Sequence, residues 1–105
     1  MTNAMIIFNE SQRLAEEGVI KYTGKEFEAV DADGNEIVVK ETEELHTYSV
    51  WKDMGYQVRK GEHAVAKIMI WKYTVKKDKE TDEEESQMFM KRANFFSQSQ
   101  VDKAN

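Results

Sequence analysis

Residues 63–75, HAVAKIMIWKYTV, constrain the fold of this chain more than any other segment. Their alternation of apolar side chains with period two predicts a long strand. One face would carry Val65, Met69, Trp71, Tyr73 and Val75 around Lys67, and the other Ala64, Ala66, Ile68 and Ile70. Because both faces are apolar, the pattern favours a central strand of a sheet. Residues 87–96 read as a second strand, and we expect the two to pair antiparallel.

Four further elements complete the predicted fold. Strands at 27–31 and 36–40 flank Asp33-Gly34, a dipeptide that suits a two-residue type I′ hairpin turn with positive φ at both positions. A helix is predicted over 3–17, capped by Thr2 or Asn3, and a short one over 47–54, capped by Thr47. The sequence therefore predicts a single α+β domain over residues 1–105: a small antiparallel sheet of about four strands with two main helices.

Two smaller segments also carry expectations. Trp51 lies on the apolar face of the short helix, which indicates a core anchor. Ser97 is suited to cap a last helical turn near the C-terminus. Residues 77–86 are charged and lack apolar side chains, so we expect a flexible acidic loop between two strands.

The charge distribution separates the chain into basic and acidic parts. The formal net charge of −5 is the sum of −5 over residues 1–42, +3 over 43–77, −5 over 78–85 and +2 over 86–105. The basic middle is also the aromatic-rich part. No apolar run is long enough to cross a bilayer, and the N-terminus lacks the features of a signal peptide. With no cysteine in the chain, we expect a protein of the cytoplasm that does not contact membranes.

The residues that could support chemistry are sparse. His46 and His63 belong to no catalytic or metal-binding spacing, and no glycine-rich phosphate loop is present. The segment Asp31–Asn35 begins like a calcium-binding loop, but Glu36 and Thr42 stand where that motif needs glycine and glutamate. We therefore expect no catalytic residues, no metal site and no cofactor.

A binding function is indicated instead by residues 47–72, where aromatic side chains alternate with lysine and arginine. Such a mixture suits a surface that stacks on bases and neutralises phosphates. The predicted nucleic-acid-binding residues are Tyr48, Lys52, Tyr56, Arg59, Lys60, Lys67, Trp71, Lys72 and Tyr73. Single-stranded DNA is the expected partner.

The same stretch carries a family pattern. Thr47-Tyr48-x-x-Trp51-x-x-x-Gly55-x-x-Val58-Arg59-Lys60-Gly61-Glu62, with Phe96 and Gln100 four residues apart, resembles the N-terminal single-stranded-DNA-binding domain of the ArdC antirestriction family. The resemblance implies a stand-alone relative of that domain from a phage or conjugative element, with an antirestriction-related role. It does not imply a protease, because the metallopeptidase domain that follows in the full family is missing from this sequence.

Two other hypotheses stay open. The chain could be a protein-interaction or inhibitor protein of a mobile element, with the acidic loop and hairpin facing a host enzyme or another protein of the element. It could also be a fragment of a larger enzyme, which the residues favour least. The sequence favours no particular oligomeric state.

Overall fold

The computed structural model describes residues 2–104 and has two helices, seven strands and a 3₁₀ turn. In chain order they are α1 (Asn3–Glu16), β1 (Tyr22–Val30), β2 (Glu36–Thr42), β3 (Leu45–Thr47), α2 (Tyr48–Asp53), β4 (Tyr56–Val58), β5 (Ala66–Lys77), β6 (Glu84–Ser97), η1 (Gln98–Gln100) and β7 (Val101–Lys103). The predicted α+β class is confirmed. The strands form three separate antiparallel sheets, however, and not one: β1-β2, β3-β6-β5 and β4-β7.

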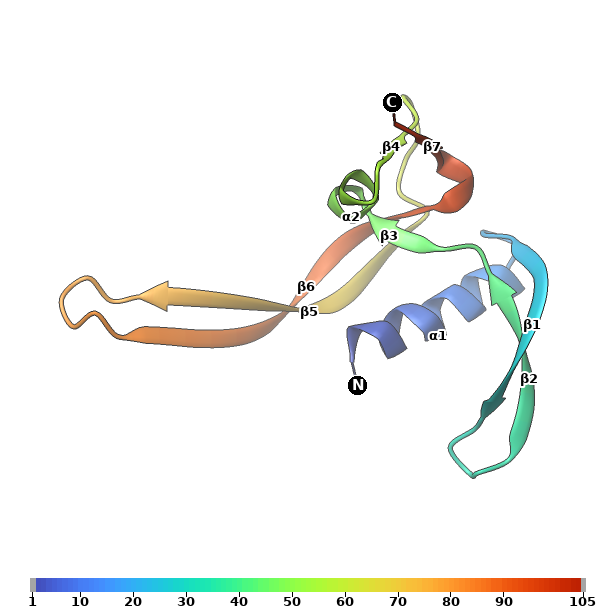
Figure 1. Cartoon of the computed structure of the whole chain (residues 1–105), viewed down its shortest axis with the longest axis horizontal. Coiled ribbons are helices and arrows are strands. Elements are labelled where there is room, and N and C mark those ends of the chain that lie inside the picture. Colours follow the sequence, from blue (N-terminus) through green and yellow to red (C-terminus); the bar gives the residue numbers. More distant parts are fainter. Residues whose placement is uncertain (1, 105) are drawn as a thin grey trace.

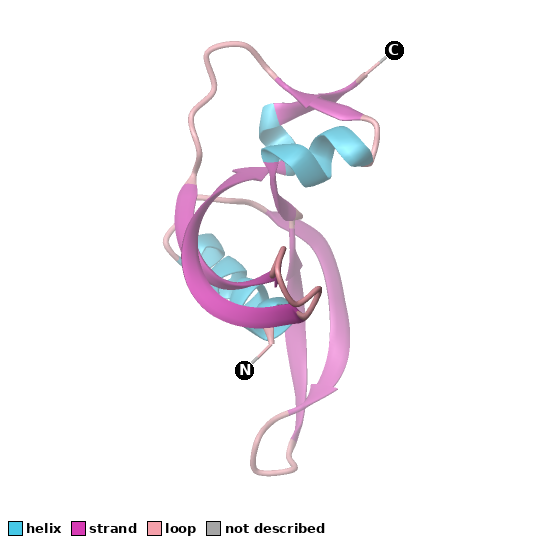
Figure 2. Cartoon of the chain, turned by 90° about the vertical axis from the view of Figure 1, so that its left-hand side faces the viewer, coloured by secondary structure: helices cyan, strands magenta, loops and turns pink. Residues whose placement is uncertain are grey.

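Two long hairpins leave a small body in different directions (Figure 1). The hairpin of β5 and β6, called the arm below, extends far to one side, and the hairpin of β1 and β2 descends beyond α1. The principal extents of 56 × 43 × 22 Å describe a flat, branched molecule. Turned by 90°, the molecule shows α2, β4 and β7 stacked at one end, above α1 (Figure 2).

The core lies where α1 covers the base of the arm. Its buried side chains come from α1, the following turn, β3 and the inner ends of β5 and β6: Leu14, Ala15, Ile20, Leu45, Ile68, Ile70 and Phe95. The hydroxyl of Thr2 accepts a hydrogen bond from the Met5 N–H at 3.2 Å and so caps α1 as predicted. Burial of these apolar side chains is the main source of stability for such a small body.

The position of β5 corrects the prediction of a central strand. β6 is central, with β3 on one side and β5 on the other, so β5 is an edge strand. Among the described residues no further strand pairs with β5; instead the Asn3 side chain bonds its outer edge. The Asn3 amide donates to the Trp71 carbonyl at 2.9 Å and accepts from the Trp71 N–H at 2.7 Å. The two apolar faces of β5 have different surroundings: Ile68 and Ile70 on one face are buried in the core, whereas Met69 and Trp71 on the other face are exposed.

The turn between β1 and β2 also differs from the prediction. Gly34 has a φ of 84°, but Asp33 is not left-handed, so the turn is not type I′. The Asp31 N–H bonds the Asn35 carbonyl, and the Asp31 carboxylate accepts from the N–H groups of Asn35 and Asp33, which hold its pKa below the ordinary value. The Asp31 side chain thus stabilises a loop that is longer than a two-residue turn, with Gly34 as its one left-handed residue.

The arm is longer than the predicted loop at 77–86 allows. β5 runs to Lys77 and β6 starts at Glu84, and only Asp78–Glu83 lie outside the strands. The register places Lys76 opposite Glu85 and Lys77 opposite Glu84, so opposite charges face each other across the hairpin, and the Lys77 ammonium forms an ion pair with Asp82 in the turn at 3.1 Å. Facing charges of opposite sign favour continuation of the ladder through this polar segment.

Candidate nucleic-acid interface

The family pattern lies in one compact part of the body, the motif lobe, formed by α2, β4, the following turn to Glu62, η1 and β7. Trp51 is its anchor, with 1% of its surface exposed, and its indole N–H donates to the Phe96 carbonyl at 2.9 Å. The rings of His46 and Tyr56 meet it edge-on, at centroid distances of 4.8 and 5.4 Å. The prediction that Trp51 is a core residue is confirmed, and Tyr56 is a half-buried packing partner.

A second contact joins the two ends of the pattern. The Gln100 amide donates to the Glu62 carboxylate at 2.9 Å and to the His63 carbonyl at 2.6 Å. Its oxygen accepts from the Ser97 N–H at 2.9 Å, completing the capping box of η1, and this confirms the predicted turn after Ser97. The buried Gln100 therefore holds the glycine turn of the pattern against the C-terminal segment.

Arg59 is held within the same lobe. Its guanidinium donates to the Asp102 carboxylate at 3.0 Å and also to the Ser99 carbonyl. Both bonds lie between the β4 end and the β7 segment, which pair from Tyr56 to Val58. The neighbouring Lys60 is exposed. Within this turn, then, Lys60 presents a free charge to solvent, whereas Arg59 already has protein partners.

Glu43 ties the lobe to the rest of the body. Only 6% of its surface is exposed, and its carboxylate accepts from the Lys21 N–H at 2.6 Å and from the Ser99 N–H and hydroxyl, both at 2.8 Å. Burial alone would raise the pKa of Glu43, but the hydrogen bonds from Ser99 and Lys21 outweigh it, and the pKa lies below the ordinary value. Glu43 is thus a structural carboxylate.

The arm presents a different kind of surface. Side chains at alternate positions of β5 share a face with their cross-strand partners on β6. This arm face contains Lys67, Met69, Trp71, Tyr73 and Val75 from β5, opposite Asn94, Arg92, Met90, Met88 and Ser86 of β6. Trp71 is 39% exposed and Tyr73 64% exposed. Lys72 belongs to the opposite face, beside Phe89 and close to Lys91.

The nine predicted site residues therefore fall into two groups. Tyr48, Lys52, Tyr56, Arg59 and Lys60 belong to the motif lobe, and Lys67, Trp71, Lys72 and Tyr73 to the arm. The structure brings Lys67, Trp71 and Tyr73 together on one face and adds Arg92, which lies opposite Met69. Sequence reasoning missed Arg92. The expected antiparallel pairing of the two strands could have placed Arg92 beside Lys67 and Trp71, but only if the register of that pairing had been known.

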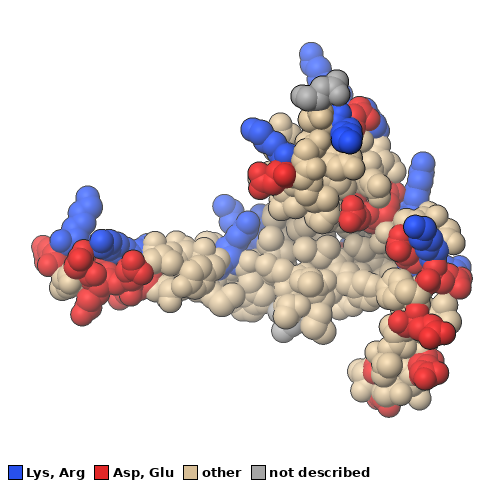
Figure 3. Space-filling model, in the orientation of Figure 1, with Lys and Arg blue, Asp and Glu red and all other residues tan. Residues whose placement is uncertain are grey.

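Figure 3 shows how charge is distributed over one side of the molecule. Acidic and basic side chains gather at the arm tip and acidic ones on the β1–β2 hairpin, while the middle of the arm is uncharged. Basic side chains reappear where the arm meets the body. The arm thus offers an apolar and aromatic middle bounded by basic residues on the body side.

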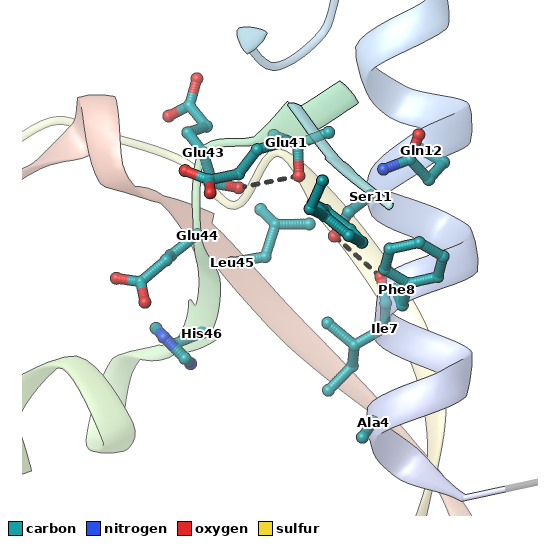
Figure 4. A pocket seen from close by; sticks show the side chains of 12 residues that line it. Ala4, Ile7, Phe8, Ser11, Gln12, Glu41, Glu43, Glu44, Leu45 and His46 are labelled. Carbon is teal, nitrogen blue, oxygen red and sulfur yellow. Dashed lines mark hydrogen bonds between the residues drawn. The ribbon is translucent and has the colours of Figure 1, made fainter. Parts of the chain in front are cut away.

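Two concave sites adjoin these surfaces. A cavity of about 270 Å³ lies between α1 and the β2–β3 segment (Figure 4), lined by apolar side chains such as Ile7, Phe8 and Leu45. Glu44 and His46 point away from the helix (Figure 4). Of its polar lining residues, Ser11 and Glu43 already bond backbone groups of the protein, and we assign no ligand to this site. The second site, of about 590 Å³, is lined by Thr2, Asn3, Trp71, Tyr73 and Met88, and we call it the arm hollow.

Other kinds of site are not found in the described part of the chain. Residues 2–104 contain no group of three or more His, Asp or Glu side chains placed to hold a metal ion. Nor does any helix within that range have the length and apolar character needed to span a membrane.

Comparison with known proteins identifies the family. No curated protein and no solved structure matches the chain. Residues 38–101, more than half of the 105, match the family described as the N-terminal domain of anti-restriction factor ArdC. That range begins within β2, includes the arm, and covers the motif lobe as far as Val101, the first residue of β7. The match confirms the resemblance found on Trp51, Gly55 and the Arg59–Glu62 turn: this chain belongs to the family of ArdC N-terminal domains.

Proposed function

We propose that this protein is a non-enzymatic module that binds single-stranded DNA through the arm face. The observation that carries the proposal is the presence of Trp71 and Tyr73 on one exposed face with Lys67 and Arg92. Family membership supports an antirestriction-related role. We also propose a phage or conjugative element as its source, as the family resemblance implies, and the cytoplasm as its location.

Stacking and charge supply complementary parts of the binding free energy. Trp71 and Tyr73 are two positions apart on one strand, which separates their side chains by roughly 6.5 Å along the arm. Stacking of a base on an exposed ring is worth roughly 1–3 kcal/mol. Lys67 and Arg92 would neutralise phosphates, a contribution that weakens with salt.

Single strands suit this surface better than duplexes. A ring on the arm can stack only on a base whose face is not already covered by neighbouring bases. The arm tip, residues 76–85, carries six acidic and three basic side chains, and this net negative charge repels a long, stiff polyanion. We therefore expect weak to moderate binding without sequence preference, and weaker binding to duplex DNA.

Fluorescence anisotropy of a labelled oligothymidylate tests the proposal. Wild-type protein should bind at low salt, with a slope of log K against log salt of about −0.7 per phosphate contacted. The double variant Lys67→Ala/Arg92→Ala should lower affinity and flatten the slope. The control variant Lys21→Ala/Lys25→Ala removes the same charge from exposed positions before and within β1. It should change the affinity and the salt slope little, because it alters only the net charge of the protein. Absence of binding at low salt would refute the DNA proposal.

One observation favours a second candidate, a protein-interaction role. The outer face of the β1–β2 hairpin carries Glu26, Glu28 and Glu36 beside the exposed Val30 and Val38. An acidic face with apolar centres suits a basic protein surface, such as that of a host enzyme or of another protein of the element. This candidate would lead if the protein bound no oligonucleotide and a Glu28→Lys/Glu36→Lys variant lost a partner captured by the wild type.

A further inference from the structure

The arm hollow lies where the first turn of α1 reaches the outer edge of β5. Its floor is formed by the side chains of Trp71, Tyr73 and Met88, and its wall by Thr2 and Asn3. The two hydrogen bonds between Asn3 and the Trp71 backbone fix the distance between wall and floor. The hollow is thus a feature of the docked helix and not of the arm alone.

We propose that the arm hollow is a subsite for one nucleobase of a bound single strand. This rests on the proposed function and adds where a base is held and how it is oriented. The base would lie against the rings of Trp71 and Tyr73 and the thioether of Met88. Its hydrogen-bonding edge would face Thr2 and Asn3.

The chemistry of the hollow fits a planar heterocycle with a polar edge. Its volume of about 590 Å³ falls within the roughly 300–1,000 Å³ of small-molecule sites, which are mostly apolar with a few polar groups. The Thr2 hydroxyl oxygen accepts from Met5, which leaves its hydrogen free to donate. The Asn3 amide retains one N–H and one lone pair after bonding Trp71.

Charge on the same face favours one side of the hollow for the phosphates of the bound strand. Lys67 and Arg92 lie on the arm face between the hollow and the body, whereas residues 76–85 at the tip carry six acidic and three basic side chains and are net negative. A phosphate next to the bound base is therefore attracted toward the body and repelled from the tip. This asymmetry favours a nucleic-acid ligand over an apolar side chain of a protein partner, which would leave both cations and the polar wall unused.

The test compares two labelled probes of equal length and charge: a decathymidylate and the corresponding abasic decamer, which has the same phosphates but no bases. Trp71→Leu and Tyr73→Leu keep apolar bulk and remove the ring. Each should weaken decathymidylate binding about ten-fold and leave abasic binding unchanged. Tyr22→Leu, which removes a similarly exposed ring from the other hairpin, is the matched control and should leave both unchanged.

The outcomes separate this inference from the proposed function. Binding of neither probe by the wild type would refute DNA binding, and the subsite with it. Binding of decathymidylate that both variants leave intact, or that they weaken equally for both probes, would refute the subsite alone. If Trp71→Leu failed to fold, Tyr73→Leu would decide, because Tyr73 is 64% exposed. Quenching of Trp71 fluorescence by decathymidylate but not by the abasic decamer is a further expected result, since buried Trp51 cannot stack on a ligand.

Discussion

The motif lobe and the arm are both rich in aromatic and basic residues, but they use them in opposite ways. In the lobe, Trp51 is buried and Arg59 is bonded to Asp102 and Ser99. On the arm, Trp71 and Arg92 lie on an open face. The residues that identify the family are thus mainly those that hold the lobe together. The surface suited to a ligand lies largely outside the pattern, so the motif marks the fold and the arm face carries the proposed function.

The two tryptophans give the strongest test of this comparison. Trp51→Ala should destabilise the protein by about 3–5 kcal/mol, because it leaves a large cavity and an unpaired Phe96 carbonyl. Trp71→Ala should cost clearly less, because Trp71 is 39% exposed and lies outside the buried core cluster. Urea unfolding followed by circular dichroism measures both. A large loss of stability in the Trp71 variant would show that the arm is also part of the core.

The next largest effect concerns Glu43. Glu43→Gln should lower stability by about 1–3 kcal/mol near neutral pH, because a charged acceptor of several buried hydrogen bonds is replaced. The folded-state pKa of Glu43 is below its usual value near 4.5. Its contribution is therefore complete above that value and lost as the pH falls through the folded pKa.

Urea unfolding between pH 7 and pH 3 measures this dependence. The gap between wild type and Glu43→Gln should narrow as the pH falls. Glu44→Gln, at the exposed neighbouring position, should follow the wild-type curve. A gap that stayed constant with pH would contradict the assignment of a stabilising charged form.

Two arginines sharpen the comparison at a smaller energy. Arg59→Ala should cost about 1 kcal/mol of stability and leave the salt slope of DNA binding unchanged, because its ion pair is largely exposed and structural. Arg92→Ala should keep stability and reduce the slope by about 0.7. Thermal unfolding and salt titration of oligonucleotide binding give the two readings. If Arg59→Ala flattened the slope instead, the motif turn would also contact DNA, in agreement with the sequence-based prediction for Arg59 and Lys60.

The smallest effect concerns the arm tip. We expect Asp78–Glu83, the segment outside the strands, to exchange its amide protons much faster than Ile68–Ile70 at the base. Hydrogen exchange measured by NMR would show the gradient along the arm. Equal protection at the tip and the base would mean that the arm is rigid throughout.

Much of the fold followed from local signals in the sequence. The helix at 3–17, the short helix after Thr47 and both hairpins could be predicted because capping residues, glycines and alternation act over a few neighbours. The core role of Trp51 was predicted from its position on one helix face. The turn after Ser97 was predicted from its capping side chain.

What could not be predicted depends on contacts between distant segments. The short strands β3, β4 and β7 are too short to show a period, and each exists only through its partner, as Leu45–Thr47 does through β6. For the same reason, the sequence did not show that β5 lies at an edge. Nor could it show which way a charged side chain points: Arg59 turns toward Asp102, and Arg92 acquires neighbours only through the register.

The contact between Asn3 and Trp71 also bears on how this chain avoids aggregation. An edge strand as long and apolar as β5 offers unpaired backbone groups to which another polypeptide could add. The Asn3 amide bonds the outward N–H and carbonyl of Trp71 as a neighbouring strand would, and interrupts that edge beside its most apolar stretch. Lys72, Lys76 and Lys77 add positive charge farther along the same strand, where α1 does not reach. The first turn of the N-terminal helix therefore helps to keep copies of the chain from joining through their sheets.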